Sequence, residues 1–184
     1  GYARRCGLNH ARGKYYVCMD ADTLYPVHYI QTMLRKLEQP AVAGVYSLWS
    51  FIPDKEHSRL GLAIYELLRD MHLLLTSLNR PELNVRGMVF AYRTDYGRQI
   101  GFRVDIRRGE DGAMALELKK YGKLKLLLSR KARPVTAVTT LSKDGSLLKS
   151  FMKRMFHSLK SGGAYFTKKT HYADTDENMI NLQK

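Results

Sequence analysis

The chain has 184 residues and a mass of 21.2 kDa, which suits one domain with a sizeable core. Its 45% hydrophobic and 26% charged residues are typical of a globular protein and exclude disordered and low-complexity classes. The formal net charge of +14 alone would indicate a protein that binds nucleic acid or an anionic membrane. The charge is uneven, because residues 119–169 contain 14 basic residues and one acidic residue and so carry +13 of it.

The two cysteines, Cys6 and Cys18, are too few for a disulfide scaffold or a four-cysteine zinc site, and they favour a reducing compartment. No apolar run approaches the roughly 20 residues that span a bilayer, and the first residues lack the apolar core of a signal peptide. We therefore expect a cytoplasmic protein whose contact with a membrane, if it has one, is peripheral and at the inner face.

The first elements alternate between strand and helix. Residues 15–19 are apolar and aromatic and predict a buried strand, which ends in an acidic turn at residues 20–23. A helix with Pro26 near its first turn follows, and residues 41–51 return as a strand. The predicted inner face of that helix consists of Val27, Ile30, Met33, Leu34 and Leu37. This order predicts an α/β domain.

Ser58 is the predicted N-cap of a second helix of about 18 residues. One side of it carries Leu60, Ile64, Leu67, Leu68 and Met71. Because both sides of this helix are apolar, we expect it to pack into a groove or against a partner. A strand over residues 87–92, an arginine-rich loop over residues 97–109 and a helix over residues 112–121 come next, and strands over residues 123–128 and 135–141 complete the α/β part. No linker divides these elements, so residues 1–141 are expected to form one domain.

Residues 142–184 are predicted to add a basic amphipathic helix and a polar tail. Apolar side chains recur on one helical face between residues 147 and 159, with Lys149, Lys153, Arg154 and Lys160 on the other sides. Two interpretations remain open: the apolar face packs on the domain, or the helix lies on anionic lipid.

Two acidic pairs are the strongest candidates for chemistry. Asp20 and Asp22 follow a buried strand, where α/β sheets place their ligands, and carboxylates suit Mg²⁺ or Mn²⁺ bound to a phosphate. Glu110 and Asp111 stand between a cationic loop and a helix, where a carboxylate could act as general base. Each pair has a simpler alternative, since acidic residues also cap helices.

Four stretches together resemble family 2 glycosyltransferases, which have the GT-A type fold. They are Ala-Arg-Arg-Cys-Gly at residues 3–7, Asp-Ala-Asp-Thr at residues 20–23, the strand at residues 86–93, and Gly-Glu-Asp at residues 109–111. Their order and spacing agree with that family over residues 1 to about 140. The resemblance implies a GT-A type (Rossmann-like) mixed sheet flanked by helices.

The resemblance also implies roles for individual residues. Donor binding would fall to Arg4, Asp20, Ala21 and Asp22, with Asp22 as the metal ligand. Asp111 would be the catalytic base and Glu110 would orient it or touch the acceptor. The acceptor side would include Gly87, Arg93 and Gly109. A third metal ligand could be His157 or His171, between which the sequence does not choose.

The chain departs from the family pattern in three respects. Arg5 stands where the family has asparagine. No Gln-x-x-Arg-Trp motif follows the Glu-Asp pair, and Trp49 lies far upstream, so a processive synthase is not expected. The chain also begins at a motif that lies well inside such enzymes, so we expect the N-terminal strands of the fold to be missing, and the chain alone to bind donor weakly.

The sequence thus predicts an inverting glycosyltransferase that uses Mg²⁺ or Mn²⁺. It would move a sugar from a nucleotide-sugar donor, expected to be a UDP-sugar, to a saccharide or lipid-linked acceptor in cell-surface glycan synthesis. The alternatives are a nucleic-acid-binding protein that uses the basic C-terminal half, and an inactive scaffold with the same fold. No helix-turn-helix, RNA-recognition or zinc-finger signature supports nucleic acid as a partner. A homo-oligomer stays open.

Overall fold

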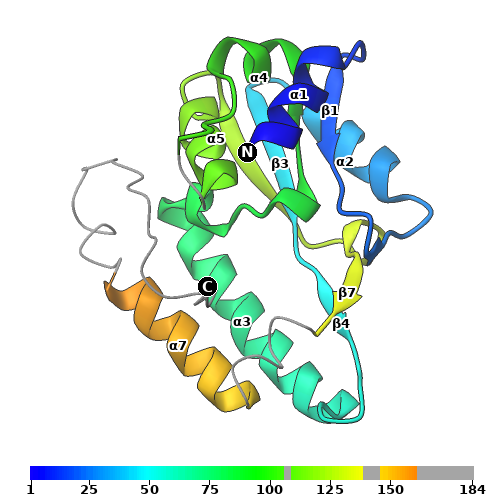
Figure 1. The fold of residues 1–184 in the computed structure, drawn as a ribbon, viewed down its shortest axis with the longest axis vertical. Helices are drawn as coiled ribbons and strands as arrows, with labels where there is room; N and C mark the ends of the chain where they lie inside the picture. The colour runs from blue at the N-terminus through cyan, green and yellow to red at the C-terminus, as the bar shows by residue number, and fades with distance from the viewer. Residues whose placement is uncertain (106–108, 139–145, 161–184) are drawn as a thin grey trace, which may run out of the picture.

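The computed structural model describes residues 1–105, 109–138 and 146–160, which form a mixed α/β fold (Figure 1). Its main sheet has four strands in the order β1-β5-β3-β6. Strand β5 pairs antiparallel with both β1 and β3, whereas β3 and β6 are parallel. The four strands are β1 (Tyr15–Cys18), β3 (Val42–Ser47), β5 (Phe90–Arg93) and β6 (Lys123–Leu127).

Helices cover both faces of this sheet because its strands alternate their side chains between two apolar cores. On one face, Tyr46, Phe90 and Tyr92 pack with residues of α1 (Tyr2–His10) and α5 (Glu110–Leu118). On the other face, Val45 and Ala91 pack against α2 (Tyr29–Leu37) and η3 (Arg130–Ala132). The expectation of a mixed sheet flanked by helices is confirmed.

A second sheet lies below the first and has the order β2-β7-β4. It consists of β2 (Thr23–Leu24), β7 (Val135–Ala137) and β4 (Ser50–Ile52). The long helix α3 (Arg59–Asn79) extends away from the main sheet, and α7 (Leu147–Lys160) packs beside it (Figure 1). Two short turns, η1 (Pro81–Asn84) and η2 (Gly87–Val89), return the chain from α3 to β5.

Several predicted elements differ from those observed. The strand predicted over residues 87–92 begins only at Phe90, since residues 87–89 form η2, and Val27 and Ile30 of the predicted inner face of the helix after Pro26 are exposed. The single strand predicted over residues 41–51 is two strands in different sheets, because Leu48 and Trp49 leave the main sheet to pack with Leu73. The helix predicted over residues 112–121 begins at the acidic pair and ends at Leu118. Part of the loop predicted over residues 97–109 is instead the end of a helix, α4 (Thr94–Ile100).

The helix α3 begins as predicted, and one of its two apolar sides faces outward. The Ser58 hydroxyl accepts a hydrogen bond from the Gly61 N–H at 3.1 Å, which confirms the N-cap. The five apolar residues expected on one side of this helix are all exposed. The buried side consists of Leu62, Tyr65, Arg69, Leu73 and Thr76. Periodicity located the helix but could not say which of its two apolar sides faces the protein.

The basic C-terminal helix is present as α7, and Leu147 and Phe151 pack against Leu62 and Tyr65 of α3. The polar tail predicted from Thr170 onward lies outside the described residues. Among the helices of the described ranges, none has both the length and the apolar character needed to cross a membrane.

Candidate active site

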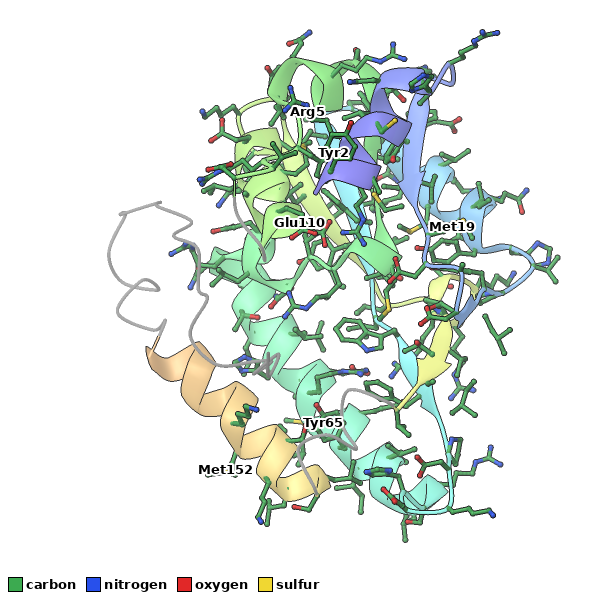
Figure 2. All side chains as sticks on the ribbon, in the orientation of Figure 1. Tyr2, Arg5, Met19, Tyr65, Glu110 and Met152 are labelled. Atoms are coloured by element: carbon green, nitrogen blue, oxygen red, sulfur yellow. The ribbon has the colours of Figure 1, made fainter. Side chains whose placement is uncertain are left out.

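Arg4 brings both predicted acidic pairs together. Its Nη1 lies 2.5 Å from Asp111 Oδ1 and 3.5 Å from Glu110 Oε1, and its Nη2 lies 3.3 Å from Asp20 Oδ1. These groups come from three separate elements, since Arg4 lies on α1, Asp20 follows β1, and Glu110 and Asp111 begin α5. Figure 2 shows Glu110 at the end of α5 that faces α1. We call these four residues the Arg4 cluster.

Gly87 makes room for the guanidinium. A Cβ atom at this position would lie 1.9 Å from Arg4 Nη2, so the arginine passes directly over the glycine backbone. The Tyr16 hydroxyl donates a hydrogen bond to the Arg4 carbonyl oxygen at 3.2 Å, which anchors α1 to β1. The predicted acceptor-side residue Gly87 therefore serves the cluster as a surface on which Arg4 rests.

A tyrosine holds the turn that carries Asp20. The Asp20 N–H donates to the Tyr25 hydroxyl at 2.8 Å, and that hydroxyl donates to the Met88 carbonyl oxygen at 3.0 Å. Burial raises the pKa of Tyr25, so its hydroxyl stays protonated and able to donate. This bridge sets the distance between the acidic turn and η2. Sequence patterns gave no signal for Tyr25, because its partner Met88 is far away in the chain.

Ala21 and Asp22 complete the turn and are both exposed. The Thr23 hydroxyl approaches Asp22 Oδ1 at 3.5 Å, which is a weak contact, and the carboxylate is accessible to a ligand. The alternative that these acidic residues cap the next helix does not apply, since the N-cap of α2 is His28.

The second acidic pair is not a helix cap either. The N-cap of α5 is Gly109, whose φ of 82° is a left-handed conformation that favours glycine, and no side chain caps this helix. The side chains of Glu110 and Asp111 therefore do not cap the helix, and they face Arg4. The positive end of the helix dipole adds to the field in which they lie.

The environment of Asp111 favours the protonated carboxyl more than water does. Burial, with a smaller contribution from the Glu110 carboxylate, raises the pKa of Asp111, while the charges of Arg4 and Arg86 act in the opposite direction. The net direction is upward, and the side chain is still 16% exposed. A carboxylate with a raised pKa is a stronger base, and this one remains within reach of a ligand.

Cys18 lies close to Asp111 and Arg4, and its thiol is unreactive. It is buried, and burial together with the nearby Asp111 carboxylate raises the pKa of its thiol to about 12. The thiol is therefore protonated at neutral pH, which excludes a thiolate nucleophile here.

A metal ion at this site would depend on Asp22 and Asp20. Among the described residues, no three His, Cys, Asp or Glu side chains gather in a way that could hold a metal. The exposed Asp22 with the half-exposed Asp20 still fits a hard divalent cation whose other ligands are substrate phosphates and water. The His157 side chain and His171 lie outside the described part, so neither can be placed near the turn.

One predicted site residue lies apart from the cluster. Arg93 pairs with Tyr15 in the sheet, whereas Phe90, at the end nearer the cluster, pairs with Cys18. Its Nη2 lies 3.4 Å from the Leu37 carbonyl oxygen, at the end of α2. The structure thus brings Arg4, Asp20, Gly87 and the Glu-Asp pair together and leaves Arg93 at the opposite end of β5.

Comparisons with known proteins identify the family of the chain and a solved structure with a similar fold. The sequence profile of glycosyl transferase family 2 matches residues 1–100. No protein of curated function matches the sequence. Among solved structures, the mannosyltransferase PcManGT from Pyrobaculum calidifontis, in complex with GDP-Man and Mn²⁺, is similar with a TM-score of 0.55 and 19% identity. The match covers 84% of this chain and 43% of that one, so the chain spans less than half of its structural neighbour. Because the family profile matches more than half of its length, the chain belongs to glycosyl transferase family 2.

Proposed function

We propose that this protein is an inverting glycosyltransferase that moves a sugar from a nucleotide-sugar donor to an acceptor. The observation that carries the proposal is the Arg4 cluster, in which Arg4 contacts both Asp111, a carboxyl of raised pKa, and Asp20 of the Asp-x-Asp turn. The nucleotide-sugar in PcManGT supports a donor of this class. The sequence predicts a UDP-sugar, whereas PcManGT is in complex with GDP-Man. The nucleotide base of the donor therefore has to be determined by experiment.

In the proposed reaction, Asp111 accepts the proton of an acceptor hydroxyl as that oxygen attacks the anomeric carbon. The bond from this carbon to the phosphate oxygen breaks, and the nucleoside diphosphate leaves with the electron pair. In this proposal Arg4 would neutralise the diphosphate, and Glu110, 3.5 Å from Arg4 Nη1, would help to hold the guanidinium. A divalent cation on Asp22, when bound, would offset the charge of the leaving group.

The acceptor and the cellular role are part of the same proposal. We propose a saccharide or lipid-linked acceptor in cell-surface glycan synthesis, with the protein at the cytoplasmic face of the membrane. Support comes from family membership and from the basic C-terminal segment.

The test is Asp111→Asn, which keeps the shape of the side chain and removes the base. We expect transfer from a panel of nucleotide-sugars, measured in the intact protein with radiolabelled donor, to fall by about 10²- to 10⁴-fold. Binding of nucleoside diphosphate, measured by calorimetry, should change little. Glu117→Gln, on the same helix, is the matched control. Equal transfer by parent and Asp111→Asn would refute the assignment of the base.

A further inference from the structure

The solvent-facing side of α3 is apolar, unlike that of an ordinary surface helix. Every side chain of α3 that is exposed between residues 60 and 78 is apolar. We call this set the α3 apolar face, and it consists of Leu60, Ala63, Ile64, Leu67, Leu68, Met71, Leu74, Leu75 and Leu78. A surface helix of a globular protein normally turns such a stripe toward the core. Monomers rarely expose a stripe of this length, about 27 Å along the helix, without a partner for it.

The charged residues of α3 between residues 60 and 78 face inward instead. Arg69 lies over the Trp49 ring, 4.4 Å from its centroid, and donates to Asp70 at 2.7 Å. Arg133, just before β7, pairs with Glu66 at 3.1 Å and with Asp70 at 2.7 Å. Two acidic and two basic side chains thus neutralise one another between α3 and the small sheet. Between residues 60 and 78, the fold thus pairs the charged side chains of α3 internally, and the exposed side chains are apolar.

The neighbouring helix supplies positive charge beside this hydrocarbon. Figure 2 shows Tyr65 between α3 and α7, and Met152 on the outer side of α7. Leu148 is 71% exposed and Met152 is 40% exposed, and Lys149 and Lys153 next to them are also exposed. Apolar side chains flanked by lysines are the pattern of a helix that lies in the interface of a bilayer.

Charge distinguishes between two candidate partners for this surface, a second copy of the chain and anionic lipid. A second copy of the chain would bring the exposed Lys149 and Lys153 of α7 close to like charges on the same surface of its partner. Anionic lipid brings the opposite charge and also accepts the apolar side chains. A helix with buried charged residues on one side does not span a membrane but can lie along it.

We propose that α3 and α7 form a docking surface for an anionic membrane, with the α3 apolar face at the boundary of headgroups and acyl chains and the α7 lysines at the lipid phosphates. The proposal extends the sequence-based expectation, which placed membrane contact on the C-terminal helix alone, and assigns the main apolar contact to α3. It does not depend on the proposed transferase activity, because binding is measured without donor or acceptor.

The test is flotation of the full chain with vesicles of phosphatidylcholine alone and of phosphatidylcholine mixed with phosphatidylglycerol. We expect binding to the mixed vesicles that weakens as salt is raised. Leu67→Glu combined with Met71→Glu should lower the partition coefficient by about a hundredfold or more, since each change replaces an apolar side chain that the lipid would bury with a charged one. Lys149→Glu combined with Lys153→Glu should lower binding to the mixed vesicles and reduce its dependence on salt.

The matched control is Leu24→Glu combined with Val27→Glu, which alters two apolar residues that are 67% and 96% exposed but lie away from α3. This variant should bind like the parent. If the Leu67 and Met71 variant does not fold, Leu75→Ser with Leu78→Ser replaces it, and circular dichroism verifies the fold of each protein. Parent binding that is absent, or equal for both vesicle types, would overturn the proposal. A parent dimer that ignores vesicles and is dissociated by the α3 substitutions would overturn it in favour of a second copy.

Discussion

The guanidinium of Arg4 rests on Gly87, so close that a single added methyl group would occupy its place. Arg4 in turn contacts carboxylates from both acidic pairs, and Asp111 is 107 residues away from it in the chain. Gly87 therefore controls the geometry of the Arg4 cluster without any side chain of its own.

Gly87→Ala is expected to disrupt the cluster while leaving the fold intact. The added Cβ would lie 1.9 Å from Arg4 Nη2. Because Gly87 is buried, we expect the flexible arginine side chain to move rather than the backbone. We expect transfer to fall by about tenfold to a hundredfold, in line with the cost of misplacing a positioning group. Enzyme assays and circular dichroism of the same preparation measure the two effects. Gly13→Ala, where the nearest atom is 3.5 Å away, is the control and should remain active.

Arg4→Met is expected to raise the pKa of Asp111 further. Burial already raises this pKa, and the Arg4 charge partly opposes the rise by stabilising the carboxylate. Without that charge, the carboxyl should hold its proton to a higher pH, so the acidic limb of the activity profile shifts upward. Carbon-13 NMR of the Asp111 carboxyl measures this directly, even if the variant is inactive.

Arg5→Met is the matched control for that titration, because Arg5 is adjacent in sequence and exposed. It should leave the Asp111 titration unchanged. A lower Asp111 pKa in Arg4→Met would contradict the account of the electrostatics given above.

Asp22→Ala is expected to remove the effect of metal on donor binding. In the intact protein, Mn²⁺ or Mg²⁺ should raise the affinity for a nucleoside diphosphate, because the exposed Asp22 carboxylate and the phosphates share the cation. Calorimetry with and without metal tests this, and Asp95→Ala, an exposed acidic residue on α4, is the control. Affinity in the parent that does not respond to metal would rule the proposal out.

Glu82→Gln is expected to destabilise the protein by about 3 kcal/mol at neutral pH, because it removes the negative charge of a fully buried carboxylate from its ion pairs. Glu82 is paired with Arg80, and it accepts a hydrogen bond from Lys119 at 2.9 Å. Burial alone raises the pKa of Glu82, but the hydrogen bonds from Arg80 and Lys119 outweigh it and hold the pKa below its ordinary value.

The pH dependence of this loss has a defined sign. Because the pKa is lower in the folded state than in the unfolded state, the ionised group stabilises the fold above about pH 4.3, and that stabilisation is lost as the pH falls through the folded-state pKa. The difference in unfolding free energy between parent and Glu82→Gln, measured in urea, should shrink over that range. A difference that stays constant with pH would contradict the ion-pair explanation, and Glu117→Gln, at a half-exposed residue, should cost less than about 0.5 kcal/mol.

Much of the fold was predictable because its elements are encoded locally. The strands at residues 15–18 and 123–127 and the cap at Ser58 follow from apolar runs and from capping chemistry within a few residues. The break at Leu48 and Trp49 was not predictable, because it depends on packing against Leu73, which is distant in sequence. The outward side of α3 was likewise hidden, since both sides of the helix are apolar.

The candidate site divides in the same way. The acidic pairs were found from their positions at element ends, and the resemblance to family 2 glycosyltransferases set their roles. The bridge through Tyr25 to Met88 and the close approach of Arg4 to Gly87 join segments 63 and more than 80 residues apart, so no local pattern contains them. The place of Arg93, at the far end of β5, follows from strand register.

The sequence by itself determined that the chain is an α/β protein with two acidic pairs in the order of a glycosyltransferase family, and that its positive charge gathers near the C-terminus. Only the tertiary structure decided that both acidic pairs contact Arg4 and that Gly87 leaves room for its guanidinium. It also decided that α3 turns most of its charged side chains inward and most of its leucines outward. Local composition sets which elements form, whereas the side each element presents depends on long-range packing and on the pairing of charges distant in sequence.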